Sequence, residues 1–230
     1  MVSLVGGGTA TMRPGELSLA AGGVLFLDEL GEFQPHALDA LRQPLEDGCV
    51  RVSRARATVT LPARFLLVAA MNPCPCGEGR PGDCTCSDAA RLRYRRRLSG
   101  PLLDRFDLRV DVTRPDVDEL LRGAGGEPSA SVADRVVAAR ARALERGVPA
   151  NARLPADRLD AEARLTDGAM AMVETSLRQG RLSARGLARI RRVARTIADL
   201  AGLEGPLRAE EVGQALALRG DPVAADRAVA

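Results

Sequence analysis

A buried strand that runs directly into two carboxylates is the feature of this sequence that most constrains its fold. The apolar run Val24–Leu27 follows two glycines and is followed at once by Asp28 and Glu29. In open α/β sheets, ligands bind at the carboxyl ends of the strands. A nucleoside triphosphate at such an edge needs one carboxylate to hold Mg²⁺ and a neighbour to orient the attacking water. We assign the first role to Asp28 and the second to Glu29. The alternative is a core strand that ends in an acidic turn.

Two further apolar runs extend this pattern. Phe65–Ala70 predicts a second buried strand, which ends at Asn72, and residues 106–112 predict a third. Continuous apolar runs are typical of strands in a parallel sheet that helices cover. An amide at such a strand end can hydrogen-bond a phosphate or the attacking water without adding negative charge, so Asn72 is a candidate catalytic residue. A turn-forming Asn before a proline is the alternative, and it is the commoner situation.

The sequence changes character beyond Pro115. Between the first two strands it predicts a short helix from Pro35 to Gly48 and a β-hairpin over residues 50–61. After Val112 no strand pattern occurs, and helical periodicity covers residues 131–146, 166–179, 183–200 and 209–218. We therefore predict an α/β protein with a partial parallel-sheet core at residues 1–113, a linker at 114–128 and an all-α domain at 129–230.

Two arginines are candidates for contacts with a nucleotide. Arg105 stands directly before the predicted third strand and would suit an arginine finger, which neutralises transition-state charge in a neighbouring subunit. A local salt bridge with Asp104 or Asp107 is the alternative. Arg185 lies in the first turn of the strongly amphipathic helix 183–200, where it would reach a phosphate. For Arg189 and Arg192 on the same helix we expect a solvated basic face.

Four of the five cysteines lie within one loop. They form the pairs Cys74-x-Cys76 and Cys84-x-Cys86 in a stretch rich in Gly and Pro. Two close pairs of thiols can converge on a tetrahedral Zn²⁺, although one residue between the members of a pair is tighter than the usual two to four. A loop of reduced cysteines is the alternative. Cys49 stands apart and is expected to be structural.

Basic residues gather on the hairpin and on a helix around residues 88–98, where DNA phosphates would be neutralised without base reading. All 33 basic residues of the chain are arginines, and the net charge of +3 is too small to indicate a nucleic-acid partner by itself. A solvated helix face is the alternative for the helix. The residues concerned are Arg51, Arg54 and Arg56 on the hairpin, and Arg91, Arg93, Arg95, Arg96 and Arg97 on the helix.

Nothing in the sequence indicates a membrane or a secretory route. Residues 1–10 lack the basic and apolar regions of a signal peptide, and the longest apolar run, Phe65–Met71, is too short to span a bilayer. Clustered cysteines are typical of metal ligands or reduced thiols rather than of a secreted disulfide framework. We therefore expect a cytoplasmic protein with no membrane partner.

At this point the motifs resemble those of a known family. Val24–Glu29 resembles the Walker B motif of AAA+ ATPases, Asn72 their sensor 1, Arg105 their arginine finger and Arg185 their sensor 2. More narrowly, the chain resembles the ComM/YifB branch of magnesium-chelatase-like proteins over residues 4 to 220. The phrases that carry this likeness are Arg13–Glu16, Leu41–Gly48, Ala69–Gly77 and Ser99–Arg105.

The resemblance implies a hexameric ring that binds ATP and Mg²⁺ and hydrolyses ATP between subunits. Proteins of this family are associated with DNA branch migration during natural transformation. Two other functions stay open: a non-catalytic ring or scaffold subunit that lends Arg105 to a partner, and a chelatase-type motor subunit for metal insertion. The cysteine loop argues against the last.

The sequence departs from the family in one respect. The family carries a Lon-protease-like domain and a Walker A phosphate loop, Gly-x-x-x-x-Gly-Lys-Ser/Thr, before the matching region. This chain contains no lysine, and Gly6–Thr11 has the glycines without the spacing. We therefore expect a truncated product, a wrongly placed start codon or one half of a split protein with a complementing N-terminal half. We also expect ATP hydrolysis by these 230 residues alone to be weak or absent.

Overall fold

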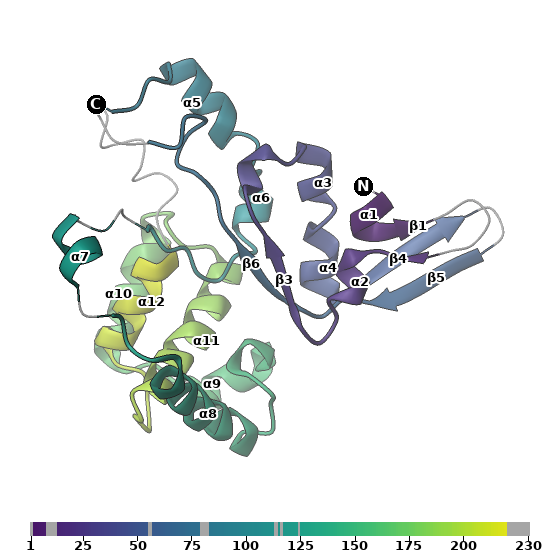
Figure 1. Cartoon of the computed structure of the whole chain (residues 1–230). Helices are drawn as coiled ribbons and strands as arrows, with labels where there is room; N and C mark the ends of the chain where they lie inside the picture. The colour runs from purple at the N-terminus through teal and green to yellow at the C-terminus, as the bar shows by residue number, and fades with distance from the viewer. Residues whose placement is uncertain are drawn as a thin grey trace. The chain divides into compact units, whose positions relative to one another are not determined.

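The computed structural model describes residues 2–7, 13–54, 57–78, 83–112, 115, 117–123 and 125–219. The chain divides into two compact units, Met1–Arg105 and Phe106–Ala230, called here the first and the second unit. Figure 1 shows the strands and short helices of the first unit in purple to blue and the helices of the second in teal to yellow. The mixed α/β class predicted from the sequence is confirmed.

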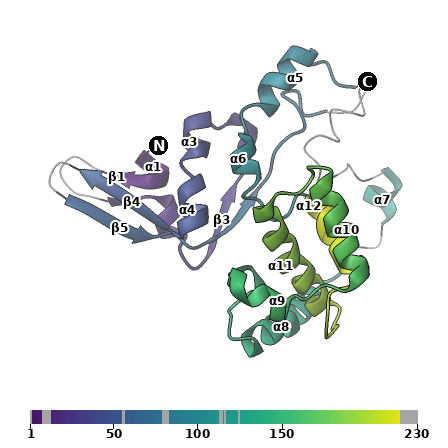
Figure 2. The same cartoon turned by 180° about the vertical axis from the view of Figure 1, so that it is seen from behind.

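The first unit contains the predicted parallel strand pair. Strand β3 (Val24–Leu27) pairs in parallel with β6 (Leu66–Ala69), in a register that sets Val24 opposite Leu66 and Leu27 opposite Ala69. Figure 1 labels the two strands side by side, and Figure 2 shows β3 of this pair from behind. Because the strands are parallel, Asp28 and the segment that leads to Asn72 leave the sheet at the same edge.

Only one face of this strand pair is covered. Leu25 and Leu27 are buried, whereas the alternate side chains on both strands are exposed: Val24, Phe26, Leu66 and Val68. A parallel sheet normally has helices on both faces. Our expectation of strands buried on both sides is therefore wrong within the described residues, which supply cover for one side only.

The predicted helix from Pro35 to Gly48 is divided in two. Helix α3 (Pro35–Asp39) is followed by its C-cap residue Ala40, and α4 (Arg42–Asp47) begins two residues after that cap. Pro44 has no N–H to donate to the Ala40 carbonyl, so a continuous helix would lose that bond. A proline is tolerated in a first turn, which is its place in α4. Gly48 then ends α4 in the left-handed conformation, with φ of 68°. A 3₁₀ turn, η1 (Leu30–Glu32), connects β3 to α3.

The predicted hairpin is confirmed. Strands β4 (Cys49–Arg54) and β5 (Ala57–Pro62) pair antiparallel from Cys49 opposite Pro62 to Arg54 opposite Ala57. Val50 and Val52 are buried, as their period-two spacing predicts. Arg56 at the tip lies outside the described residues.

Short elements complete the first unit. At its start, α1 (Val2–Val5), β1 (Gly6–Gly7), β2 (Arg13–Pro14) and α2 (Glu16–Leu19) follow one another, and β1 pairs antiparallel with β2. At its end, the predicted arginine-rich helix is α5 (Asp88–Arg95), capped by the hydroxyl of Ser87, and α6 (Gly100–Leu103) is capped by that of Ser99.

The third strand predicted at residues 106–112 does not form. These residues belong to the second unit, and Leu108, Val110 and Val112 are 50%, 67% and 91% exposed. The Arg109 N–H donates to the Leu218 carbonyl, at 2.6 Å, instead of to a neighbouring strand. An apolar alternation becomes a strand only where a second backbone offers a ladder of donors and acceptors, and the described residues offer none here.

The second unit is helical, as predicted. Its core is built from small and branched side chains of its helices and of the segments between them, among them Val173, Ile190 and Val212 on helices and Leu154 and Leu207 between helices. None of the helices in the described residues combines the length and apolar character that a bilayer crossing requires. The elements are α7 (Val117–Arg122), α8 (Ser129–Glu145), η2 (Asn151–Arg153), η3 (Ala156–Arg158), α9 (Leu159–Glu162), α10 (Asp167–Arg178), α11 (Ala184–Leu200) and α12 (Ala209–Arg219).

Candidate functional site

The two parallel strand ends interlock at the edge where the candidate catalytic side chains lie. The Ala70 N–H donates to the Leu27 carbonyl at 2.9 Å, and the Leu30 N–H donates back to the Ala70 carbonyl at 2.8 Å. Asp28, Glu29 and Asn72 are all exposed at this edge. The structure thus brings the ends of the two strands that carry these side chains together, as the strand order in the sequence predicts.

Glu29 has an unusual backbone conformation. Its φ of 48° and ψ of 46° are left-handed, and it is the non-glycine residue with a positive φ in the described part of the chain. Its N–H donates to Oδ1 of Asp28 at 2.8 Å. A non-glycine residue in this region costs on the order of 1–3 kcal/mol and needs support from its surroundings. The turn that carries Glu29 is therefore held by contacts elsewhere.

Tyr94 of helix α5 and Arg97, two residues beyond the end of that helix, supply such contacts. The phenol ring of Tyr94 is buried against Gly31, where an added Cβ would collide with it. Arg97 donates to the Gly31 carbonyl and to Glu32, at 3.1 Å for the carboxylate, and its guanidinium lies 5.7 Å from the Tyr94 ring centre. Burial, and next the Glu32 carboxylate, raise the pKa of Tyr94. The turn after Glu29 is thus clamped by side chains more than sixty residues away.

The strand-end residues fit Mg²⁺ bound together with a nucleotide. Mg²⁺ in phosphate-transferring sites takes one or two carboxylates, and phosphates and water supply the remaining oxygens. Asp28 offers such a carboxylate in an exposed position, and Glu29 a second one beside it. Asp28 would hold the ion, and the ion would draw charge from the phosphates.

Arg105 makes three contacts within its own unit. Its Nε donates to the Arg42 carbonyl at 2.9 Å, its Nη1 to the Pro101 carbonyl at 2.6 Å, and its Nη2 pairs with Glu46. The side chain is 13% exposed. The salt-bridge alternative named Asp104 or Asp107 as partner, whereas the recorded ion pair is with Glu46, on α4.

Arg185 lies exposed in the first turn of α11, which the hydroxyl of Ser183 caps. It belongs to the second unit, whereas the strand-end edge belongs to the first. Our expectation of a solvated face is wrong for Arg192. Its Nε donates to the Leu154 carbonyl at 2.9 Å, and burial lowers its pKa. Arg189 pairs with Asp107 at 3.4 Å.

The four loop cysteines converge, as their spacing predicts. The Sγ atoms of Cys74, Cys76, Cys84 and Cys86 all lie within 4.8 Å of one another, and all are free thiols. Cys74 is buried and the others are partly or fully exposed. The backbone N–H of Glu78, followed by the Cys74 thiol, lowers the pKa of Cys76 to about 5, while burial raises that of Cys86 to about 12.

The basic residues of α5 and of the two positions after it fall into two groups. Arg91 pairs with Asp88, and Arg97 is committed to Gly31 and Glu32, so both act within the first unit. Arg93, Arg95 and Arg96 are exposed, as is Arg51 on the hairpin. Of Arg54 only the backbone is described.

The second unit contains a buried ionic cluster that we did not predict from the sequence. Asp199 is 0% exposed. Its carboxylate accepts hydrogen bonds from Arg146 at 2.8 Å and from Asn151 at 2.7 Å, and it forms an ion pair with Arg195 at 3.2 Å. Burial lowers the pKa of Arg195, and the Asp199 carboxylate opposes this shift. Asp199 follows Arg195 by four residues on the buried side of α11, a signal that could have indicated the pair.

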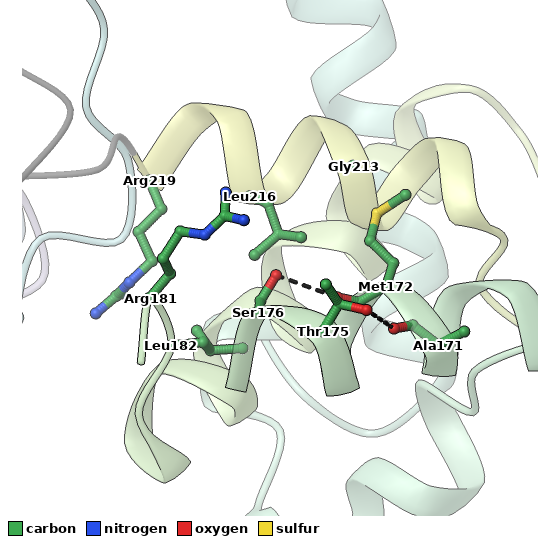
Figure 3. Close-up of a pocket in the computed structure, with 9 residues that line it drawn as sticks. All are labelled: Ala171, Met172, Thr175, Ser176, Arg181, Leu182, Gly213, Leu216 and Arg219. Atoms are coloured by element: carbon green, nitrogen blue, oxygen red, sulfur yellow. Dashed lines mark hydrogen bonds between the residues drawn. The ribbon is translucent and has the colours of Figure 1, made fainter. Parts of the chain in front are cut away.

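A cleft of about 560 Å³ opens between α10 and α12 (Figure 3). Its wall is mostly apolar, with Met172 and Leu216 facing one another, and Arg181 and Arg219 stand at one end. The hydroxyls of Thr175 and Ser176 donate to carbonyls of their own helix. No carboxylate or thiol of the described residues lines it, so the candidate chemistry stays with the first unit.

Comparison with known families agrees with this geometry. A family model described as "Magnesium chelatase, subunit ChlI" matches residues 1–120, and one described as "Magnesium chelatase, subunit ChlI C-terminal" matches residues 126–219. The competence protein ComM of Haemophilus influenzae is 47% identical over 203 residues, and the uncharacterized protein YifB of Escherichia coli is 47% identical over 202. The chain belongs to the ComM/YifB family of magnesium-chelatase-like proteins.

The ComM/YifB relatives are much longer than this chain. The matches cover 88% of this chain and 40% of ComM, and 87% of this chain and 40% of YifB. An uncharacterized protein of Mycobacterium tuberculosis is 45% identical over 223 residues, which are 95% of this chain and 44% of that protein. The chain thus spans about two fifths of the length of these relatives. The predicted family is confirmed, and with it a magnesium-chelatase-like AAA+ assignment.

Proposed function

We propose that this chain supplies the hydrolysis and sensing part of an ATP-driven ring motor that acts on DNA. The observation that carries the proposal is the parallel pairing of β3 with β6, which sets Asp28 and Glu29 at the same sheet edge as the strand end before Asn72. Family membership supports the use of ATP and Mg²⁺.

Each strand-end residue has a distinct role in this proposal. Asp28 holds Mg²⁺ against the phosphates, and Glu29 orients the attacking water. Asn72 donates its amide N–H to the γ-phosphate or positions the water. Arg185 of the second unit contacts a phosphate. The clamp formed by Tyr94 and Arg97 keeps the Glu29 turn in its left-handed conformation.

A chimera with ComM of H. influenzae tests this function. The 203 residues that match are replaced by the corresponding residues of this chain, and phosphate release is measured with Mg²⁺ and ATP. We expect turnover that Glu29→Gln lowers by at least about tenfold, since the water would no longer be oriented. Glu16→Gln, at an exposed glutamate of α2, is the control. If the chimera assembles and Glu29→Gln does not change its turnover, the result would favour a non-catalytic ring or scaffold subunit.

We propose that the ring is a homo-hexamer in which Arg105 serves the nucleotide of a neighbouring subunit. Such a finger is worth about 10³-fold or more in turnover. In that role Arg105 would have to leave the Arg42 and Pro101 carbonyls when the ring assembles. Mixing Arg105→Ala chimera chains into wild-type rings should suppress turnover while nucleotide binding persists. If the turnover of rings that contain Arg105→Ala stays within a few-fold of wild type, Arg105 does not act on the nucleotide of a neighbouring subunit.

DNA is the proposed substrate of the motor, and the cytoplasm its compartment. Arg51, Arg93 and Arg96 are exposed, and one relative is named a competence protein. Fluorescence anisotropy of a labelled duplex gives the binding constant at several salt concentrations. The slope of the logarithm of this constant against the logarithm of the salt concentration should fall in magnitude by about 2 in Arg93→Ala/Arg96→Ala. Arg178→Ala, at an exposed arginine of the second unit, is the control. An unchanged slope in the double variant would show that Arg93 and Arg96 do not contact DNA phosphates.

We propose that a complementing N-terminal half covers the exposed face of β3 and β6. This face presents Val24, Phe26, Leu66 and Val68, and the relatives carry more than half of their length outside the matching region. Co-expression with the unmatched part of the M. tuberculosis relative should yield a complex that Phe26→Glu disrupts and Val137→Glu, at an equally apolar exposed site on α8, does not. If the chain forms a dimer with itself when the added half is absent, a second copy of this chain would be the partner that covers the exposed face of β3 and β6.

A further inference from the structure

The loop cysteines have the dimensions of a tetrahedral thiolate site. A Zn–S bond of about 2.3 Å places the sulfurs of a regular tetrahedron about 3.8 Å apart. The recorded Sγ–Sγ distances are 3.3 Å from Cys74 to Cys76, 3.5 Å from Cys74 to Cys84 and 3.7 Å from Cys76 to Cys84. Cys86 completes the set within 4.8 Å. In the described part of the chain, this is the one group of three or more His, Cys, Asp or Glu ligands so close together.

The surroundings favour a bound metal over free thiols or disulfides. A disulfide needs an S–S distance of about 2.0 Å, and all four thiols are free. Backbone N–H groups of Glu78 and Thr85 donate to the Cys76 sulfur. Donors of this kind stabilise thiolate ligands and orient them. Four thiolates in a tetrahedron select Zn²⁺ among the common divalent ions.

We propose that Cys74, Cys76, Cys84 and Cys86 bind one Zn²⁺, and that this ion fixes the path from the end of β6 to helix α5. Cys74 follows Asn72 by two residues, and Ser87, the N-cap of α5, follows Cys86 directly. All four positions of the tetrahedron are filled by protein, which is typical of a structural site rather than a catalytic one.

The zinc links two elements of the candidate ATP site. One end of the loop carries Asn72, and the helix at its other end carries Tyr94, with Arg97 just beyond it, to the turn after Glu29. With the loop released, Tyr94 and Arg97 still reach Gly31 and Glu32, but the zinc no longer fixes the start of α5. This consequence matters for catalysis only if the proposed function holds, but zinc binding itself and the docking of α5 do not depend on ATP.

Metal content is the first test. The 230-residue chain, purified under reducing conditions without added zinc, should contain about one equivalent of zinc by mass spectrometry of the metal. The Cys74→Ser/Cys84→Ser variant should lose it, and Cys49→Ser, outside the loop, should keep it. Replacement by Co²⁺ should give the thiolate-to-cobalt absorption of a tetrahedral site. Zinc-free protein, iron in its place or a disulfide within the loop would overturn the proposal.

The docking of α5 is the second test, and the sequence provides its probe. Tyr94 is the one tyrosine of a chain without tryptophan, so tyrosine fluorescence reports this residue alone. Tyr94 is 3% exposed, so acrylamide should quench it weakly in the zinc-bound chain and at least about twofold more strongly after a chelator removes the ion. Gly31→Ala, which displaces the ring, should raise quenching while zinc is retained. If zinc removal does not change the quenching, the proposal that the zinc holds α5 in place would be refuted, whatever the ATPase assay shows.

Discussion

Replacing Arg105 by alanine separates an architectural role from a role between subunits. In this chain the guanidinium ties α4 to α6 through the Arg42 and Pro101 carbonyls and the Glu46 carboxylate. Glu46 is 44% exposed, so the ion pair contributes about 1 kcal/mol or less. Each bond from a charged donor to a carbonyl contributes about 1.5–3 kcal/mol, and water restores part of the loss. We expect Arg105→Ala to lower the free energy of unfolding of the first unit by about 2–4 kcal/mol.

Urea denaturation followed by Tyr94 fluorescence measures this loss in the right place. Tyr94 lies in the first unit, so the probe is insensitive to unfolding of the second. Glu46→Gln removes only the ion pair and should cost about 1 kcal/mol or less. Arg178→Ala removes a 78% exposed arginine from the second unit and should leave the Tyr94 transition unchanged.

The result also bears on the arginine finger. A denaturation midpoint of Arg105→Ala equal to that of Arg178→Ala would refute the architectural reasoning. If turnover of the chimera then fell by about 10³-fold, the side chain would act on a neighbouring nucleotide. A large loss of stability would show instead that the fold itself depends on Arg105.

Two further predictions concern buried charges of the second unit. Asp199→Asn leaves the buried Arg195 and the partly buried Arg146 without their carboxylate and should cost about 3–5 kcal/mol in urea denaturation followed by far-UV circular dichroism. Asp160→Asn, at a 91% exposed carboxylate, should cost about 1 kcal/mol or less, and equal costs would refute the assignment. The Arg208 side chain, which bonds to Glu211, lowers the pKa of that buried carboxyl. Its stabilisation is therefore present above the unfolded pKa of about 4.3 and lost as pH falls through the lower folded value. Glu211→Gln should flatten the acid side of the stability profile, whereas Glu174→Gln, at an exposed site, should not.

Much of the candidate site could be predicted from local sequence. The parallel strands, the hairpin, the helices of the second unit and the convergence of four cysteines all follow from periodicity or from spacing within a short stretch. Asp28, Glu29 and Asn72 could be found in this way because each lies within three residues of the end of a strand. The division of the helix before Gly48 is also a local property of the sequence, because Pro44 has no N–H to donate.

Contacts between distant segments were decided by the tertiary structure alone. Arg105 pairs with Glu46 of α4, which lies 59 residues away in the sequence and which local sequence could not indicate. Tyr94 fits against the turn after Glu29 because Gly31 has no side chain there. Residues 106–112 have the alternation of a strand, but among the described residues no second backbone forms a ladder of hydrogen bonds with them. The sequence by itself determined which segments are apolar, strand-forming or helical, since these are local properties. Only the folded chain decided which charges and rings meet, because such contacts depend on how distant elements pack.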